Sequence, residues 1–175
     1  PNNSSSNITD DRVVQAIADL NELFSNSSTF GASPQYTNAG ISSVDTEIQF
    51  CLAEFDPQGN PTTGITRTPT DLSDLKRDDA CPGQIINQDE CLKLLSFWNS
   101  NDYLNLWVVN SICTSASGLN AECGLTGYSY SAAAHGQTYD GPVVISSVLG
   151  GASEDAAYVA HEIGHYLNLL DTYYD

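Results

Sequence analysis

The stretch that decides the fold of this chain is His161-Glu162-Ile163-Gly164-His165, followed by YLNLLD at positions 166–171. On a helix, residues four apart lie on one face, so His161 and His165 can both direct an imidazole nitrogen at a single metal ion. Glu162 is too close to one histidine to be a comfortable ligand, but it is well placed to accept a proton from a metal-bound water. The spacing therefore predicts a zinc site with two histidine ligands and a general base.

The alternative interpretation is that the HExxH pattern occurs by chance on an ordinary buried helix. At 3.6 residues per turn, a set of mostly apolar positions lies opposite the histidines: Ala156, Val159, Ile163, Tyr166, Leu167 and Leu170. Ser153 can cap this helix, and Gly150-Gly151 supply the loop before it. We therefore expect one face of the helix to pack against the core while the other face binds the metal.

Tetrahedral zinc needs a third protein ligand, and Asp171 is the candidate. A helix continued as far as Asp171 would carry its carboxylate away from the metal, so the chain has to turn back. Asn168 marks the turn, because asparagine, after glycine, is among the residues that best tolerate the left-handed conformation. Asp175 is a weaker rival for the third position. We expect His135 to be a solvated loop residue, with a role as fourth ligand as the less favoured alternative.

The whole string resembles the zinc-binding signature of the metzincin peptidases, HExxHxxGxxH, and reads HExxHxxNxxD in this chain. Asn168 replaces the glycine of that signature, and Asp171 replaces its third histidine. Aspartate is a zinc ligand in its own right. Because a carboxylate lowers the net charge of the zinc centre, the bound water should be somewhat less acidic than with three neutral imidazoles.

A second resemblance lies in residues 50–67, which read FCLAEFDPQGNPTTGITR. This segment is similar to the pappalysin-type branch of the metzincins, which includes the cytophagalysins and ulilysin-like enzymes, and LNLWV at 104–108 is similar to the next strand of that branch. The resemblance covers about residues 9–175 and implies a zinc endopeptidase that acts on protein or peptide substrates. It implies these site residues: His161, His165 and Asp171 as zinc ligands, with Glu162 as general base.

The composition fits an extracellular protein. The chain has 175 residues, a net charge of −17 with only five basic residues, and 41% hydrophobic content, which suits one globular domain. This charge makes nucleic acid and anionic membranes poor partners and would attract a cationic substrate. No apolar run reaches transmembrane length, and a chain that begins at Pro1 without methionine reads as the processed form of a secreted protein. Calcium binding cannot be read from the sequence.

Five cysteines agree with an oxidising compartment. Cys81 and Cys91 bracket one polar segment, and Cys113 and Cys123 bracket another, so two local disulfides form the natural scheme. Cys51 is left over. It is either a buried free thiol within a strand or the partner of a cysteine that is missing here.

The other elements follow from local patterns. Residues 1–8 are expected to form a flexible tail, with order starting at Ile8, and a backing helix follows with Thr9 as its N-cap and an apolar stripe: Val13, Ile17, Leu20 and Phe24. Strict alternation predicts a half-buried strand over 46–55. A short helix is expected over 91–98, and further strands over 104–109, 127–132 and 141–148. The strand at 127–132 could form the rim of a cleft and pair with an extended substrate.

This order of elements predicts an α+β (α/β-like) fold with a mixed, twisted β-sheet, a backing helix and an active-site helix. Residues 9–175 would form the upper, N-terminal subdomain of a metzincin. Metzincins continue after the third ligand into a subdomain with a methionine-containing turn, and this chain contains no methionine. We therefore expect that a C-terminal subdomain, with most of the specificity pocket, is missing from the chain.

The function that the sequence favours is that of a secreted zinc metalloendopeptidase. The alternative, from another class, is a non-catalytic secreted binding module in which the same residues hold a structural or vestigial metal. Glu162 distinguishes the two, because a structural site needs no acid there and usually closes its fourth coordination position.

Overall fold

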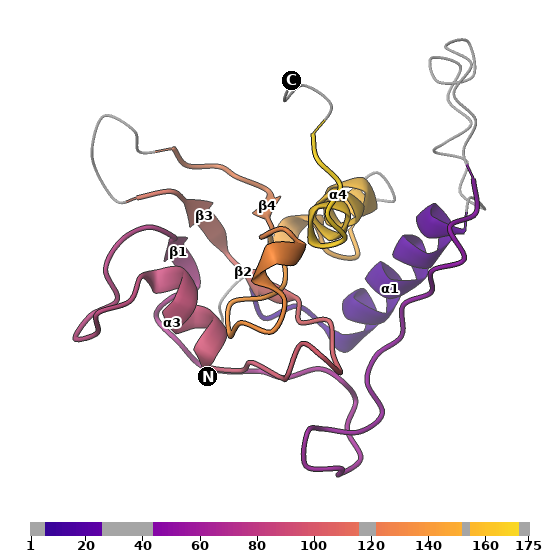
Figure 1. Cartoon of the computed structure of the whole chain (residues 1–175), viewed down its shortest axis with the longest axis horizontal. Coiled ribbons are helices and arrows are strands. Elements are labelled where there is room, and N and C mark those ends of the chain that lie inside the picture. Colours follow the sequence, from indigo (N-terminus) through magenta and orange to yellow (C-terminus); the bar gives the residue numbers. More distant parts are fainter. Residues whose placement is uncertain (1–5, 26–43, 116–121, 152–154, 172–175) are drawn as a thin grey trace.

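The computed structural model describes residues 6–25, 44–115, 122–151 and 155–171 (Figure 1). The helices and strands follow one another in this order: α1 (Asp10–Phe24), β1 (Asp74–Lys76), α3 (Gln88–Leu94), β2 (Trp107–Val109), β3 (Ser111–Cys113), β4 (Gly127–Tyr128), β5 (Val143–Ile145) and α4 (Ala156–Tyr166). Two 3₁₀ turns, η2 (Ala132–Ala134) and η3 (Ser146–Val148), flank β5. The predicted α+β class with a mixed sheet is confirmed.

The sheet that carries the site has the strand order β2-β5-β4. β2 runs parallel to β5, with Trp107 opposite Val143, whereas β4 runs antiparallel to β5, with Tyr128 opposite the same Val143. A second, smaller sheet pairs β1 with β3 in parallel. Among the described residues β4 pairs on one side only, so it is an edge strand with main-chain groups available on its other side.

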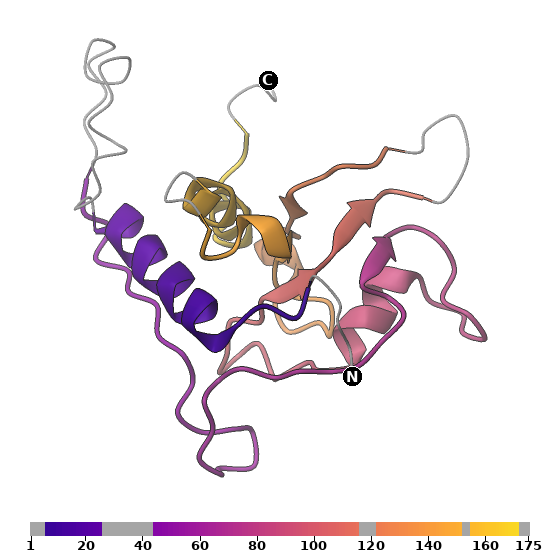
Figure 2. The same cartoon turned by 180° about the vertical axis from the view of Figure 1, so that it is seen from behind.

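Two apolar clusters lie on opposite sides of the strands. Figures 1 and 2 both show α1 and α4 side by side on one side and α3 on the other. The first cluster joins both of these helices to β5: Ile8, Ala16, Leu20, Val144, Val148, Leu149, Val159 and Ile163. The second lies on the α3 side: Leu75, Leu92, Trp107, Val109, Ile112, Tyr128 and Val143. Because Val143 and Val144 are adjacent in β5 and point to opposite faces, one strand supports both clusters.

Helix α1 begins where the sequence predicted and is tied to the loop that leads into α4. The Thr9 hydroxyl accepts a hydrogen bond from the Arg12 backbone N–H at 3.4 Å, which is the expected N-cap. The Arg12 guanidinium donates to three carbonyl oxygens of that loop, at 2.9 Å to Ser146, 2.7 Å to Leu149 and 3.3 Å to Gly150. A Cβ added at Gly150 would lie 1.9 Å from the Arg12 carbonyl oxygen, so this close approach admits only glycine.

The predicted strand over 46–55 is wrong. This segment has no regular secondary structure, and its one β-bridge to the described residues joins Phe55 to Pro61. The side-chain amide of Asn21 takes the place of a neighbouring strand: it accepts from the Phe50 N–H at 2.7 Å and donates to the Phe50 carbonyl oxygen at 2.9 Å. Ile48, predicted to be on the packed face, is 39% exposed. Alternation in the sequence was not matched by a partner strand.

The other predicted elements exist but are shorter than expected. The strand regions 104–109, 127–132 and 141–148 contain β2, β4 and β5, and the helical region 91–98 overlaps α3, which begins earlier, at Gln88. The earlier start is set by Asn87, whose side chain accepts from the Glu90 backbone N–H at 2.9 Å.

Both predicted disulfides are present, between Cys81 and Cys91 and between Cys113 and Cys123. Cys51 is a free thiol, and it is exposed rather than buried. The segment around it forms no strand, so no sheet covers the thiol. Within the described ranges, no helix combines the length and the apolar character needed to cross a bilayer.

Candidate metal centre

Helix α4 presents the HExxH stretch. Its N-terminal flank is Asp155, whose side chain makes no capping hydrogen bond, while the predicted cap Ser153 lies outside the described residues. The packed face is confirmed at Val159 and Ile163, which are 3% and 1% exposed. The prediction that Leu167 and Leu170 also lie on the packed face is wrong, since they are 42% and 77% exposed. The helix ends at Tyr166, so helical periodicity no longer applies to them.

The helix ends in a turn that brings the chain back over its own last residues. Asn168 has φ 71°, so the left-handed conformation predicted there is confirmed. The Asn168 N–H donates to the His165 carbonyl oxygen and the Leu169 N–H to the Gly164 carbonyl oxygen, both at 2.9 Å. These two bonds are the Schellman pattern, which satisfies helix carbonyls that would otherwise lack partners. The turn directs Asp171 toward the two histidines.

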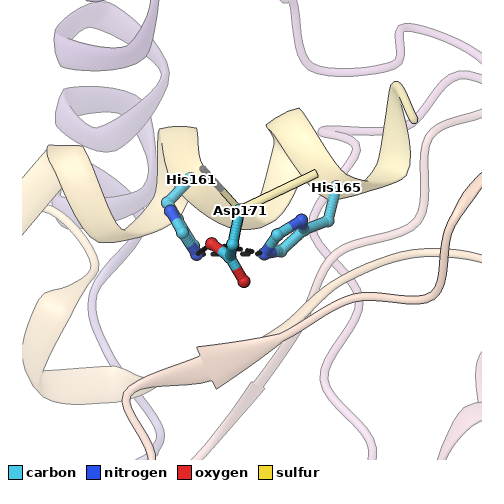
Figure 3. Close-up of side chains that lie close together, drawn as sticks. All are labelled: His161, His165 and Asp171. Atoms are coloured by element: carbon cyan, nitrogen blue, oxygen red, sulfur yellow. Dashed lines mark hydrogen bonds and ion pairs between the residues drawn. The ribbon is translucent and has the colours of Figure 1, made fainter. Parts of the chain in front are cut away.

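Three ligand atoms converge beside this turn (Figure 3). The Nε2 atoms of His161 and His165 are 3.0 Å apart, and Asp171 Oδ1 lies 3.4 Å from the first and 3.6 Å from the second. Ligands at 2.0–2.1 Å in a tetrahedron are separated by about 3.3 Å, so the triangle has the size that zinc requires. Two imidazole nitrogens and one carboxylate oxygen are also a donor set that zinc accepts. In the described part of the chain no other group of three possible ligands lies this close together.

The ring orientation of His165 is fixed by the same turn. Its Nδ1 lies 2.9 Å from the Leu169 carbonyl oxygen, which can only accept a hydrogen bond. The proton of the neutral ring is therefore on Nδ1, and the lone pair on Nε2 is free to face Asp171 and His161. The sequence could not identify this contact, because any residue at position 169 offers a carbonyl oxygen.

Glu162 is the buried acid of the site, with 6% of its surface exposed. Its Oε2 has no hydrogen-bond partner among the described residues. Burial raises the pKa of Glu162 to about 7; the nearby His165 opposes this rise, and the Asp171 carboxylate adds to it. A buried carboxylate oxygen without a partner is costly in a purely structural role, which makes Glu162 a candidate for a functional one.

Strand β4 lies directly against Glu162. A Cβ added at Gly127 would be 2.8 Å from Glu162 Cγ and 3.0 Å from the Val143 carbonyl oxygen. Only glycine therefore fits between the edge strand and the buried acid without a shift. Sequence reasoning placed Gly127 in a rim strand but missed this contact, because it joins residues far apart in the chain.

Replacing Gly127 with alanine should displace Glu162 or β4 and lower the free energy of unfolding by roughly 1–3 kcal/mol, the usual range for overpacking. The measurement is thermal or denaturant unfolding of the two proteins side by side. Gly164→Ala is the matched control, because its new Cβ would meet Leu169 at an ordinary 3.7 Å and alanine favours a helix. Equal stability of the Gly127 variant and the unmodified protein would show that the strand and Glu162 are not in close contact.

Of the other two candidates from the sequence, His135 is not part of the three-ligand group. His135 lies in a loop with its side chain 52% exposed, and its Nδ1 is 3.2 Å from Asp140 Oδ2. This matches the solvated loop role, although its contact with the fully buried Asp140 was not predicted. Asp175 lies outside the described residues.

The arrangement of a helix with two histidines and a buried acid, a left-handed turn that brings Asp171 back to them, and an adjacent edge strand belongs to a metzincin-like fold. Three solved structures share it: mature mirolysin of Tannerella forsythia in complex with a cleaved peptide (TM-score 0.76), mirolysin in complex with compound 9 (0.72) and a promirolysin mutant (0.71), each 28% identical in sequence. Mirolysin is a pappalysin/ulilysin-family metzincin, so the predicted resemblance to this branch is confirmed.

The matches cover 100%, 97% and 97% of this chain but 62%, 60% and 52% of the respective mirolysin chains. The chain therefore spans little more than half of the length of the proteins whose fold it shares. No family model matches the chain, and no curated protein sequence matches it either.

Proposed function

We propose that this protein is a secreted zinc metalloendopeptidase. The observation that carries the proposal is the convergence of His161, His165 and Asp171 at separations of 3.0–3.6 Å, which suit one tetrahedral ion. Glu162, buried and next in sequence to the first histidine, adds the acid that a structural metal site would not need.

The residues of this chain would divide the work of peptide hydrolysis. His161, His165 and Asp171 would hold the zinc ion, which when bound polarises the scissile carbonyl and lowers the pKa of a water molecule. Glu162 would accept the proton of the attacking water and deliver it to the leaving amine. Its unpartnered Oε2 is available for that proton, and its buried position limits competing water.

The edge strand β4 gives the site a way to hold a substrate. An extended peptide can pair with the unpaired side of β4 through main-chain hydrogen bonds, which would place its backbone next to Gly127 and therefore near Glu162. One of the mirolysin structures contains a cleaved peptide, and the shared fold extends this expectation to a peptide substrate here.

We also propose an extracellular location and a further subdomain. Two disulfides support an oxidising compartment. A further subdomain is supported by the coverage of 62% or less of the mirolysin chains and by exposed leucines beside the metal centre, of which Leu169 and Leu170 are 65% and 77% exposed. Apolar side chains gathered in this way are typical of a surface that another part of a protein covers.

The proposal is tested by peptide cleavage with and without a metal chelator, on the full-length gene product. We expect cleavage that stops when zinc is removed and returns when zinc is restored. Zinc binding without cleavage of any peptide in a diverse library would contradict the proposal and favour the non-catalytic binding module. Cleavage that the chelator leaves unchanged would contradict the role of the metal.

A further inference from the structure

A hollow of about 330 Å³ lies beyond the end of β4, separate from the three metal ligands. It is lined by residues of α3 and of the segment that follows β4: Glu90, Tyr130, Ser131, Ala133, Ala134 and Tyr139. Its walls combine the acidic side chain of Glu90, the hydroxyl group of Ser131 and the phenol rings of two tyrosines, with two small alanines. A hollow of this size can take one long side chain but not a folded partner.

The lining has the chemistry that binds an organic cation. The Glu90 carboxylate is half-buried, and none of the described residues forms an ion pair with it. The rings of Tyr130 and Tyr139 pack edge to face, with centroids 5.1 Å apart. Aromatic rings attract cations, and a carboxylate adds a charge-assisted hydrogen bond. A lysine or arginine side chain fits this combination, because its apolar stem can contact the rings and alanines while its charge meets Glu90.

A buried hydrogen-bond network around Asp89 and Lys93 holds the two tyrosines of the hollow in place. Tyr130 donates its hydroxyl proton to Asp89 Oδ2 at 3.0 Å, and Lys93 Nζ lies 3.1 Å from Asp89 Oδ1. The same ammonium group donates to the Tyr139 carbonyl oxygen at 2.9 Å. Asp89 and Lys93 are both fully buried and offset each other's charge. The Lys93 ammonium also lies 4.6 Å from the centroid of the Tyr130 ring, so the network orients this ring and already occupies one of its faces.

The hollow lies where a peptide paired with β4 would pass. Ser131 lies four positions after Gly127, which is next to Glu162, so the two are at most about 13 Å apart along an extended chain. Tyr128 packs in the cluster on the α3 side, and Tyr130 reaches Asp89 of the same helix. A peptide antiparallel to β4 would therefore pass the hollow a few residues before its scissile bond, with every second side chain directed to the α3 side.

We infer that this hollow is a subsite for a lysine or arginine side chain on the N-terminal side of the scissile bond, and that Glu90 determines its specificity. The inference rests on the proposed peptidase function. It also agrees with the net charge of −17, which draws cationic peptides toward the protein before any contact forms.

The test compares peptides that carry arginine or its uncharged analogue citrulline, one position at a time, two to five residues before the cleaved bond. In the full-length protein we expect kcat/KM to be about tenfold higher with arginine at one of these positions. Glu90→Gln should remove this preference, and Glu90→Lys should transfer it to a glutamate peptide. Glu54→Gln is the matched control, because Glu54 is exposed and outside the hollow, and it should keep the arginine preference.

Binding of the same peptides to the Glu162→Gln variant, followed by fluorescence anisotropy, separates the two hypotheses. Tighter binding of the arginine peptide that disappears on adding Glu90→Gln supports the subsite even if no peptide is ever cleaved, in which case only the peptidase function fails. Equal binding of arginine and citrulline peptides, or a preference that Glu90→Gln leaves unchanged, would overturn the subsite even if cleavage is efficient.

Discussion

Replacing Glu162 with glutamine should leave zinc binding intact and lower kcat by a factor on the order of 10² to 10⁴. Glutamine has nearly the same shape as glutamate, so the close packing against Gly127 is preserved. Its amide cannot accept the proton of the attacking water, which is the task assigned to Glu162. Because none of the three converging ligand atoms belongs to Glu162, the metal content should not change.

The measurement combines steady-state kinetics on a cleaved peptide with the zinc content per chain. Glu54→Gln serves as control, since it removes the same charge from an exposed position and should keep the activity of the unmodified protein. If the Glu162→Gln variant cleaved the peptide nearly as fast as the unmodified protein, Glu162 would not be the general base. Loss of zinc in the glutamine variant would instead make Glu162 a ligand or a support for one.

Local signals were sufficient to predict much of this site. Two histidines four residues apart share a face on any helix. The turn at Asn168 follows from the tolerance of asparagine for positive φ. Asp171 follows that turn closely, so its approach to the histidines depends on few residues. The disulfide pairs were predictable for the same reason, because each closes a short loop.

Contacts between distant segments were not predictable in this way. Alternation over 46–55 indicated a strand, but the side chain of Asn21, on α1, binds the backbone of Phe50 instead. The close approach of Gly127 to Glu162 depends on how β4 lies over α4, which no local pattern encodes. The exposure of Leu170 reflects the end of the helix, beyond which periodicity has no meaning.

The buried pair of Asp89 and Lys93 shows a further limit. Both residue types are almost always exposed, so a sequence pattern assigns them to the solvated face of α3. In the structure both are fully buried, and hydrogen bonds from Tyr128 and Tyr130 to the carboxylate complete the network. A charged pair is buried only where other elements supply such hydrogen-bond partners. Which residues come to lie beside α3 depends on the whole fold and not on the sequence of the helix.

Alanine in place of His161 or His165 should abolish tight zinc binding, because each change removes one of the three proposed ligands and no described neighbour can replace it. Asp171→Ala should weaken binding less severely, since both imidazoles remain. Asp171→His should restore much of the affinity, because imidazole is an equivalent donor and histidine is the residue of the metzincin signature. Metal content per chain and competition with a chromogenic chelator measure these differences directly.

His135→Ala is the matched control for these variants. Its ring contacts Asp140 rather than the converging ligands, so its removal should leave the zinc affinity unchanged. If the Asp171→Ala variant kept its zinc affinity, another residue would be the third ligand, and Asp175 would be the first to test. Loss of zinc in His135→Ala would place that histidine at the metal. A graded result, in which both histidines are essential and Asp171 is replaceable by histidine, is the one that the triangle of 3.0, 3.4 and 3.6 Å predicts.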